Sequence, residues 1–216
     1  MKYLPSKSGI LPLLCLGILF GWFAFSFPVK TKTLQFTIDD ASTLSIEGSS
    51  SVNSFNCGCE EDFKQYCCSL NEQDNSSTIH FVNTELEVKA RSFDCGGKVI
   101  NRDMQSALKS KKHPNIKIAL QEVVLAKPGL FQRVCDEWIT LKAKTEITIA
   151  GTSQLVELNI RAKELQSKQY RFMGSKELLM TDFGIEPPRP MMGLIKVHDE
   201  ITINLDFVVT VLGELQ

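Results

Sequence analysis

The sequence predicts an all-β protein: an eight-stranded antiparallel β-barrel with a short helix near one end. Three observations support this. Long segments alternate apolar and polar residues, tight turns link the later segments, and only residues 101–112 are typical of a helix. Strands with one apolar face must bury that face, by stacking two sheets or by closing one sheet. Closure with eight strands leaves room for side chains or one small ligand.

The first half of the chain begins with period-two alternation, as expected of half-buried strands. Leu34, Phe36 and Ile38 alternate with polar residues, and a second segment follows the Asp39-Asp40 pair. Residues 60–73 are polar and contain cysteines, so no strand is expected there. A further long strand is expected at about residues 78–93, ending at the Asp-Cys-Gly-Gly break.

The helix is expected to begin at Asn101, a favourable N-cap residue, and to end before His113-Pro114. Asp103 would lie in its first turn, which suits the helix dipole, as would lysines in the last turn. Met104 and Leu108 belong to one narrow apolar face. The last-turn lysines are Lys109, Lys111 and Lys112, and the apolar face comprises Met104, Ala107 and Leu108.

Strand character resumes after the helix and continues nearly to the end of the chain. Lysine and glutamate alternate with Ile, Leu and Ala in the longest segments, and Gly151-Thr152-Ser153 forms a tight turn between two of them. Three prolines exclude regular structure between residues 181 and 192. The expected strands cover about residues 116–121, 138–150, 155–165, 170–179 and 199–212.

Composition sets the broad class. The chain has 216 residues, 43% of them apolar and 23% charged, which suits one folded domain plus a targeting segment. The net charge of −1 leaves no electrostatic footprint for nucleic acid. No phosphate-binding loop is present and no Ser-His-Asp arrangement has supporting spacing, so we expect no enzyme and no cofactor.

Residues 1–26 have the character of a signal peptide. Lys2 and Lys7 precede an uncharged apolar run, and Ala24-Phe25-Ser26 offers a small-x-small cleavage site. The alternative is an uncleaved membrane anchor, because the run is about long enough to span a bilayer. The folded domain is then expected to cover residues 27–216.

Six cysteines follow this segment, namely Cys57, Cys59, Cys67, Cys68, Cys95 and Cys135. An exported chain with an even count favours disulfides, and six cysteines allow 15 connectivities. Cys57 with Cys95 is the single pair that we prefer. The C-x-C and C-C cluster could instead hold a metal, although its spacing lacks C-x-x-C knuckles, and free thiols are the remaining alternative.

Dispersed motifs over about residues 34–212 resemble the YceI-like family of exported lipid-binding proteins. Residues 44–55 resemble the family's first hairpin, and 101–116 resemble its helix signature. The other matching segments are Ile147-x-Ile149-x-Gly151-Thr152, Thr181-Asp182-Phe183-Gly184-Ile185 and Val197 to Ile203. The chain departs from the family at Lys111-Lys112-His113, where aromatics are frequent, and at Thr181, where Arg is frequent.

The resemblance implies a lipocalin-like barrel in the periplasm that binds or carries an amphiphilic lipid such as a long-chain isoprenoid. It does not imply catalysis, and we expect no metal. Membrane contact would run through the N-terminal segment. The alternatives are a structural or stress-response protein whose barrel is filled by its own side chains, and a thiol-dependent enzyme that uses the cysteine cluster.

Candidate ligand-binding residues are the inward-facing members of the alternating strands, since each buried methylene contributes about 0.8 kcal/mol. They could equally be packed core. Met104 and Leu108 of the helix would either guard the mouth of the barrel or plug its end. The candidates are Ile118, Leu120, Leu141, Ile147, Ile149, Leu158, Phe172, Ile203, Leu205, Phe207, Met104 and Leu108.

Overall fold

The computed structural model describes residues 30–72, 76–127 and 137–215. Residues 1–26 and Cys135 lie outside these ranges. The signal peptide or anchor and any disulfide of Cys135 therefore remain predictions. Within the described ranges, no helix is long and apolar enough to cross a membrane.

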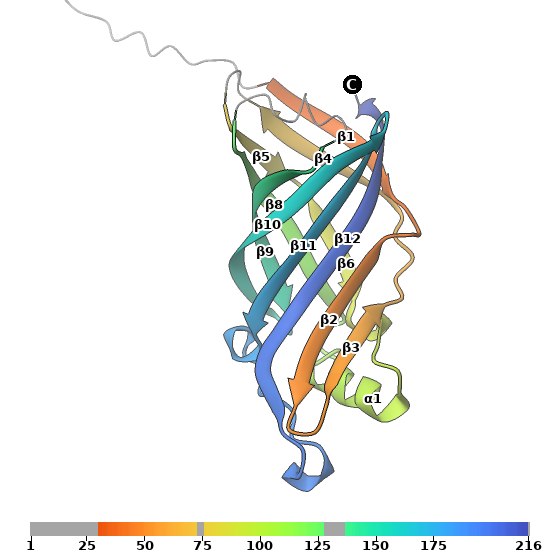
Figure 1. Cartoon of the computed structure of the whole chain (residues 1–216), viewed down its shortest axis with the longest axis vertical. Coiled ribbons are helices and arrows are strands. Elements are labelled where there is room, and N and C mark those ends of the chain that lie inside the picture. The colour runs from red at the N-terminus through yellow and green to blue at the C-terminus, as the bar shows by residue number, and fades with distance from the viewer. Residues whose placement is uncertain (1–29, 73–75, 128–136, 216) are drawn as a thin grey trace, which may run out of the picture.

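Eight strands close into an antiparallel barrel (Figure 1). The ring runs β1, β4, β5, β8, β9, β10, β11 and β12, and β12 pairs back with β1. This confirms the predicted fold class. The ring strands are β1 (Lys30–Ile38), β4 (Gln65–Glu72), β5 (Thr78–Val82), β8 (Asn115–Leu125), β9 (Ile139–Ile149), β10 (Thr152–Gln166), β11 (Gln169–Leu179) and β12 (Val197–Leu215).

Shorter strands extend the lower part of the wall in Figure 1. The last strand, β12, is long enough to pair with β2 below and with β1 above. β3 and β7 follow outward from β2, while β6 pairs with β8. These strands are β2 (Thr43–Ser50), β3 (Ser54–Cys59), β6 (Glu85–Lys89) and β7 (Phe93–Asp94).

The lower end also carries the helical segments. The α-helix α1 (Lys98–Ala107) lies there in Figure 1. The 3₁₀ turns η3 (Met180–Phe183) and η4 (Met191–Gly193) belong to the same end. A third 3₁₀ turn, η1 (Ala90–Ser92), joins β6 to β7. The ammonium of Lys109 donates a 3.0 Å hydrogen bond to the carbonyl of Gly184 and so ties the turn after α1 to η3.

The helix was predicted at residues 101–112, so its start was placed three residues too late and its end five residues too late. α1 begins after Gly97, so Asn101 is not its N-cap, no acid lies in its first turn and no lysine in its last. Asn101 instead accepts a hydrogen bond from the Cys95 amide and donates one to Asp94. The side chain is therefore engaged in the loop before the helix, and the chain enters the helix at the first residue beyond that loop.

Two strand predictions also need correction. Residues 65–72, expected to be irregular, form β4, because Tyr66, Cys68 and Leu70 alternate inward among polar neighbours. The single strand expected at 78–93 is two strands, β5 and β6. Asn83 between them has φ of +58°, a left-handed conformation that interrupts a ladder and that Asn tolerates well.

At the lower end, β3 and β6 do not pair with each other, and we call the gap between them the lower seam. Glu61 closes this seam. Its carboxylate accepts hydrogen bonds from the amide and ammonium of Lys89 and from the hydroxyl of Ser92. Burial alone would raise the pKa of Glu61, but these three hydrogen bonds together hold it below the ordinary value. The backbone bond from Glu60 to the Ser92 carbonyl completes the closure.

The cysteines give one disulfide among the described residues, and it is the preferred one. Cys57 of β3 bonds to Cys95 before α1, which confirms that pairing. Cys59, Cys67 and Cys68 are free. Burial raises the pKa of Cys59 and of Cys68, which leaves less of the reactive thiolate at neutral pH. No group of three metal-ligating side chains occurs in the described ranges.

Candidate functional site

The interior of the barrel is lined by one face of each ring strand. In β9 the residues from Leu141 to Ile149 alternate between buried apolar or small side chains and exposed or half-buried polar ones. Paired residues of neighbouring strands point to the same side of the sheet, so the register extends this inward face around the ring. Leu141 pairs with Ile160, for example, and Ile147 with Ile118.

The lower end of this interior is filled. Phe183 of η3 is fully buried, and Leu108, just after α1, is 6% exposed. Both belong to one continuous apolar core with Val88, Ile116 and Ile149. Met104 is half-buried against the same core. The α-helix therefore covers the lower end of the barrel, and Leu108 packs into the core there.

Elsewhere in the barrel, some inward apolar side chains keep part of their surface accessible, although inward residues of β8, β9 and β10 such as Leu125, Leu141 and Ala162 are buried. The accessible side chains lie mainly on β1, β4, β11 and β12, with others on β5 and β8, and we call them the half-buried lining. In β12 the change occurs along one strand, since Ile201 and Ile203 are buried while later inward residues are not. The lining comprises Phe36, Tyr66, Leu70, Phe81, Ile118, Leu120, Phe172, Leu205, Phe207 and Val209.

Aromatic rings give this lining its character. Phe36 and Tyr66, paired across β1 and β4, stack with ring centroids 5.8 Å apart. Phe207 meets Phe63 edge-on at 5.4 Å. Phe172 pairs with Phe207 across β11 and β12. Side chains that face the barrel axis without being buried leave apolar surface exposed, which favours an apolar occupant.

The predicted site residues divide between these two environments. All ten strand candidates face inward, as expected from the alternation. The buried candidates are Leu141, Ile147, Ile149, Leu158 and Ile203, and the half-buried candidates are Ile118, Leu120, Phe172, Leu205 and Phe207.

Sequence reasoning missed part of the lining. Phe36 was visible in the alternation of the first strand. Tyr66 and Leu70 were overlooked because their segment appeared too polar for a strand, although its period of two was present. Phe81 lies in the strand expected at 78–93, from which no candidate was proposed.

A separate pocket lies in the wall, between β10 and β11. The ladder joining these strands ends at the Ile160–Gly174 pair, so below it β10 pairs only with β9 and β11 only with β12. The pocket of about 410 Å³ spans this gap. Its lining includes Lys176 and four acids, namely Glu157, Glu177, Asp182 and Glu200. Such a polar gap does not suit a long apolar chain.

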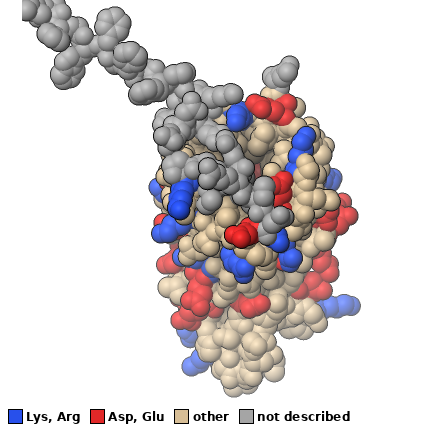
Figure 2. Space-filling model, turned by 45° about the horizontal axis from the view of Figure 1, so that its top comes forward, with Lys and Arg blue, Asp and Glu red and all other residues tan. Residues whose placement is uncertain are grey.

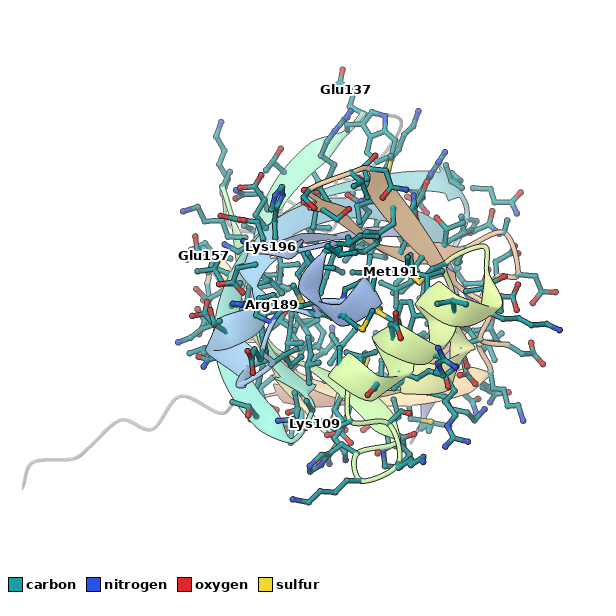
Figure 3. All side chains as sticks on the ribbon, turned by 90° about the horizontal axis from the view of Figure 1, so that it is seen from below. Lys109, Glu137, Glu157, Arg189, Met191 and Lys196 are labelled. Atoms are coloured by element: carbon teal, nitrogen blue, oxygen red, sulfur yellow. A yellow bond between two sulfur atoms is a disulfide. The ribbon has the colours of Figure 1, made fainter. Side chains whose placement is uncertain are left out.

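The Thr181–Ile185 motif lies near this gap, and its residues stabilise the lower end of the barrel. The amide and hydroxyl of Thr181 both donate to the carboxylate of Asp199, at 3.0 Å and 2.6 Å. Phe183 and Ile185 are buried in the core. Two motif segments far apart in sequence are thus joined at the lower end. Figure 3 views this end and shows α1 beside η4 with Met191.

The fold of this chain is similar to that of several solved structures. A polyisoprenoid binding domain from Saccharophagus degradans, implicated in plant cell wall breakdown, matches with a TM-score of 0.61 and 12% identity, over 82% of this chain and 99% of that one. BcnA of Burkholderia cenocepacia matches with a TM-score of 0.56 and 13% identity, over 79% and 98%. A Campylobacter jejuni YCEI protein matches with a TM-score of 0.44 and 14% identity, over 100% of this chain and 94% of that one.

The sequence matches no protein-family model and no curated protein. The structural likeness nevertheless confirms the resemblance seen in the sequence at the level of the fold. This chain has the barrel fold of a known polyisoprenoid binding domain.

Proposed function

We propose that this protein is a YceI-like binding or carrier protein for an amphiphilic lipid of the polyisoprenoid type, held against the half-buried lining. The observation that carries the proposal is that ten apolar or aromatic side chains face the barrel axis yet remain accessible. An apolar chain that covered them would gain roughly 0.8 kcal/mol per methylene. The structural neighbour that binds polyisoprenoids supports this ligand class.

The disulfide and the N-terminal sequence support an exported, periplasmic location. Disulfides persist in oxidising compartments and are rare in the cytosol. The Cys57–Cys95 bond therefore fits the signal peptide expected at residues 1–26. A binding role rather than catalysis fits the raised thiol pKa values of Cys59 and Cys68.

Within this proposal the two halves of the barrel have different roles. The lining would hold the isoprenoid chain, with Leu120, Phe172, Leu205 and Phe207 in contact with it. Leu108 would form the floor of the site, because it follows α1 directly and is buried in the core at the lower end. Candidates such as Ile149 and Leu158 would then support the wall as core residues without meeting the ligand.

Native mass spectrometry tests the proposal. Protein purified under mild conditions is expected to retain a lipid, and delipidated protein to rebind a long-chain polyprenol. Val209→Trp should fill the space against the lining and abolish rebinding. Val208→Trp is the matched control, because Val208 neighbours it on β12 and lies on the outer face.

Each outcome decides between the candidate roles. Loss of rebinding in Val209→Trp alone supports the site. A folded, delipidated wild-type protein that binds no polyprenol would reject the carrier function in favour of a filled barrel. Equal loss in both variants would place binding away from the lining.

A further inference from the structure

The lower tip of the molecule exposes large apolar side chains. The tip consists of residues 187–197, which include η4, and the β2–β3 turn at 51–53. Met191 is 65% exposed, Met192 101%, Leu194 77% and Val52 66%. No other large apolar side chain in the described ranges is more exposed than these four. In Figure 1 this loop projects beyond α1 and the other elements of the lower end.

The tip is built to hold these side chains outward. Met191 and Met192 both have φ of +56°, in the left-handed region that costs non-glycine residues conformational energy. Three prolines precede or flank them, and the amides of Gly193, Ile195 and Val197 donate back to residues 188–190. Such a braced turn presents the methionines and leaves them little freedom to fold back onto the barrel.

The two loops of the tip are joined to each other. The Ser51 amide donates to the Lys196 carbonyl at 2.8 Å, and the Lys196 amide donates to the Ser51 hydroxyl at 3.1 Å. Val52 is therefore fixed beside the Met191–Leu194 turn. The four exposed apolar side chains therefore belong to two loops that are joined at the tip.

The charged side chains within the tip are positive, and the exposed Glu186 directly precedes it. Those within the tip are Arg189 and Lys196, both exposed, and residues 187–197 and 51–53 contain no acid. Neither cation forms an ion pair within the described part of the chain. Figure 3 shows Arg189, Met191 and Lys196 at this end. The lowest part of the molecule in Figure 2 is mostly tan.

We propose that this tip docks on a lipid bilayer that carries anionic headgroups, with Met191, Met192, Leu194 and Val52 entering the interface. Apolar side chains flanked by cations suit such a surface, because the chains bury apolar area while Arg189 and Lys196 meet phosphate groups. A second copy of this chain fits less well. A symmetric contact would set the same two cations against themselves.

This docking does not require the barrel to hold lipid, so it stands independently of the proposed function. It is also distinct from the expected role of residues 1–26, because it concerns the opposite end of the folded domain. The N-terminal strand β1 begins at the upper end in Figure 1, whereas the tip lies at the lower end.

A tryptophan placed in the tip tests the proposal in the full chain. Met192→Trp is mixed with vesicles of phosphatidylglycerol and phosphatidylcholine whose acyl chains carry bromine as a quencher. Its fluorescence is expected to be quenched beyond that of the wild-type protein. Lys168→Trp, in the β10–β11 turn at the upper end, is the matched control and should show no added quenching.

Charge and apolar variants sharpen the result. Adding Arg189→Glu and Lys196→Glu to Met192→Trp should weaken the apparent vesicle affinity roughly tenfold or more, and vesicles of phosphatidylcholine alone should give little quenching. No added quenching at the tip, or equal quenching at both ends, would overturn the proposal. So would a concentration-dependent dimer that protects Met192 from oxidation without vesicles.

Discussion

The lower end of the barrel and the half-buried lining are made from the same kind of residue but differ in burial. At the lower end, α1 and η3 add Leu108 and Phe183 to the strands, and these side chains complete the core. Along the upper part of β12, Leu205, Phe207 and Val209 face the same axis and remain half-buried. The helical segments therefore complete the core at the lower end. Higher up, burial differs between strands, since Leu125, Leu141 and Ala162 are buried there while Phe172 and Phe207 are not.

The two regions also differ in their cross-links. Lys109–Gly184, Thr181–Asp199 and the Cys57–Cys95 disulfide all join elements of the lower end. The lining depends mainly on strand pairing and on ring contacts such as Phe36–Tyr66. Stability is thus expected to reside mostly in the lower end, and ligand binding mostly in the lining.

Phenylalanine truncation at each level should separate the two regions most strongly. Phe183→Ala is expected to destabilise the protein by about 3 to 5 kcal/mol, because it opens a cavity in a fully buried site. Phe172→Ala should cost only about 1 kcal/mol, because the ring is half-buried, yet it should weaken polyprenol binding. Urea unfolding measures both. Equal costs would remove the distinction between a filled end and an open lining.

Removal of the disulfide tests whether the lower end can loosen without loss of the lining. The double variant Cys57→Ala, Cys95→Ala is expected to lose about 2 to 4 kcal/mol of stability, since the bond closes a loop with a sequence separation of 38 residues. Cys67→Ser, at an exposed outward position, should stay within about 0.5 kcal/mol of the wild type. If the double variant folds but no longer binds polyprenol, the two regions are coupled.

The β9–β10 turn offers a smaller and more local change. Gly151 has φ of +84°, and a Cβ added there would collide with the ring of His113. Gly151→Ala should therefore cost about 1 to 3 kcal/mol through backbone strain and the collision. Combining it with His113→Ala should relieve the collision and leave the strain. If the losses in unfolding free energy of the two single variants simply add in the double variant, this contact is contradicted.

Alternation in the sequence was sufficient to predict which side chains face inward, but not how deeply they are buried. Leu158 and Leu205 sit in equally regular patterns, and only the first is buried. Burial depends on how many side chains cross the barrel at each level, including Leu108 and Phe183 from outside the strands. That number is set by the tertiary structure, so the half-buried lining could not be separated from core in advance.

Local signals failed where a distant partner decided the outcome. Asn101 had the properties of an N-cap, but Cys95 and Asp94 hold its amide in a loop that the disulfide to Cys57 fixes. The tip was missed for a different reason. Its prolines were interpreted only as excluding regular structure, whereas the exposed Met191 and Met192 become visible only once the turn is placed.

The seam carboxylate should give the smallest effect and the clearest dependence on pH. Glu61→Gln is expected to cost about 1 kcal/mol at neutral pH, because a neutral amide accepts more weakly from Lys89 and Ser92. The pKa of Glu61 is lowered in the folded state, so its stabilising effect is present above its ordinary pKa of 4.5 and is lost as the pH falls through the folded value.

The stability difference between wild type and Glu61→Gln should therefore shrink below about pH 4.5, and urea titrations from pH 7 to pH 3 measure it. Taking the difference removes the contribution of other carboxylates whose pKa is lowered, such as Asp94 and Asp206. A constant difference across this range would mean that Glu61 closes the seam by packing alone, and the lower end would then owe its stability to the core and the disulfide.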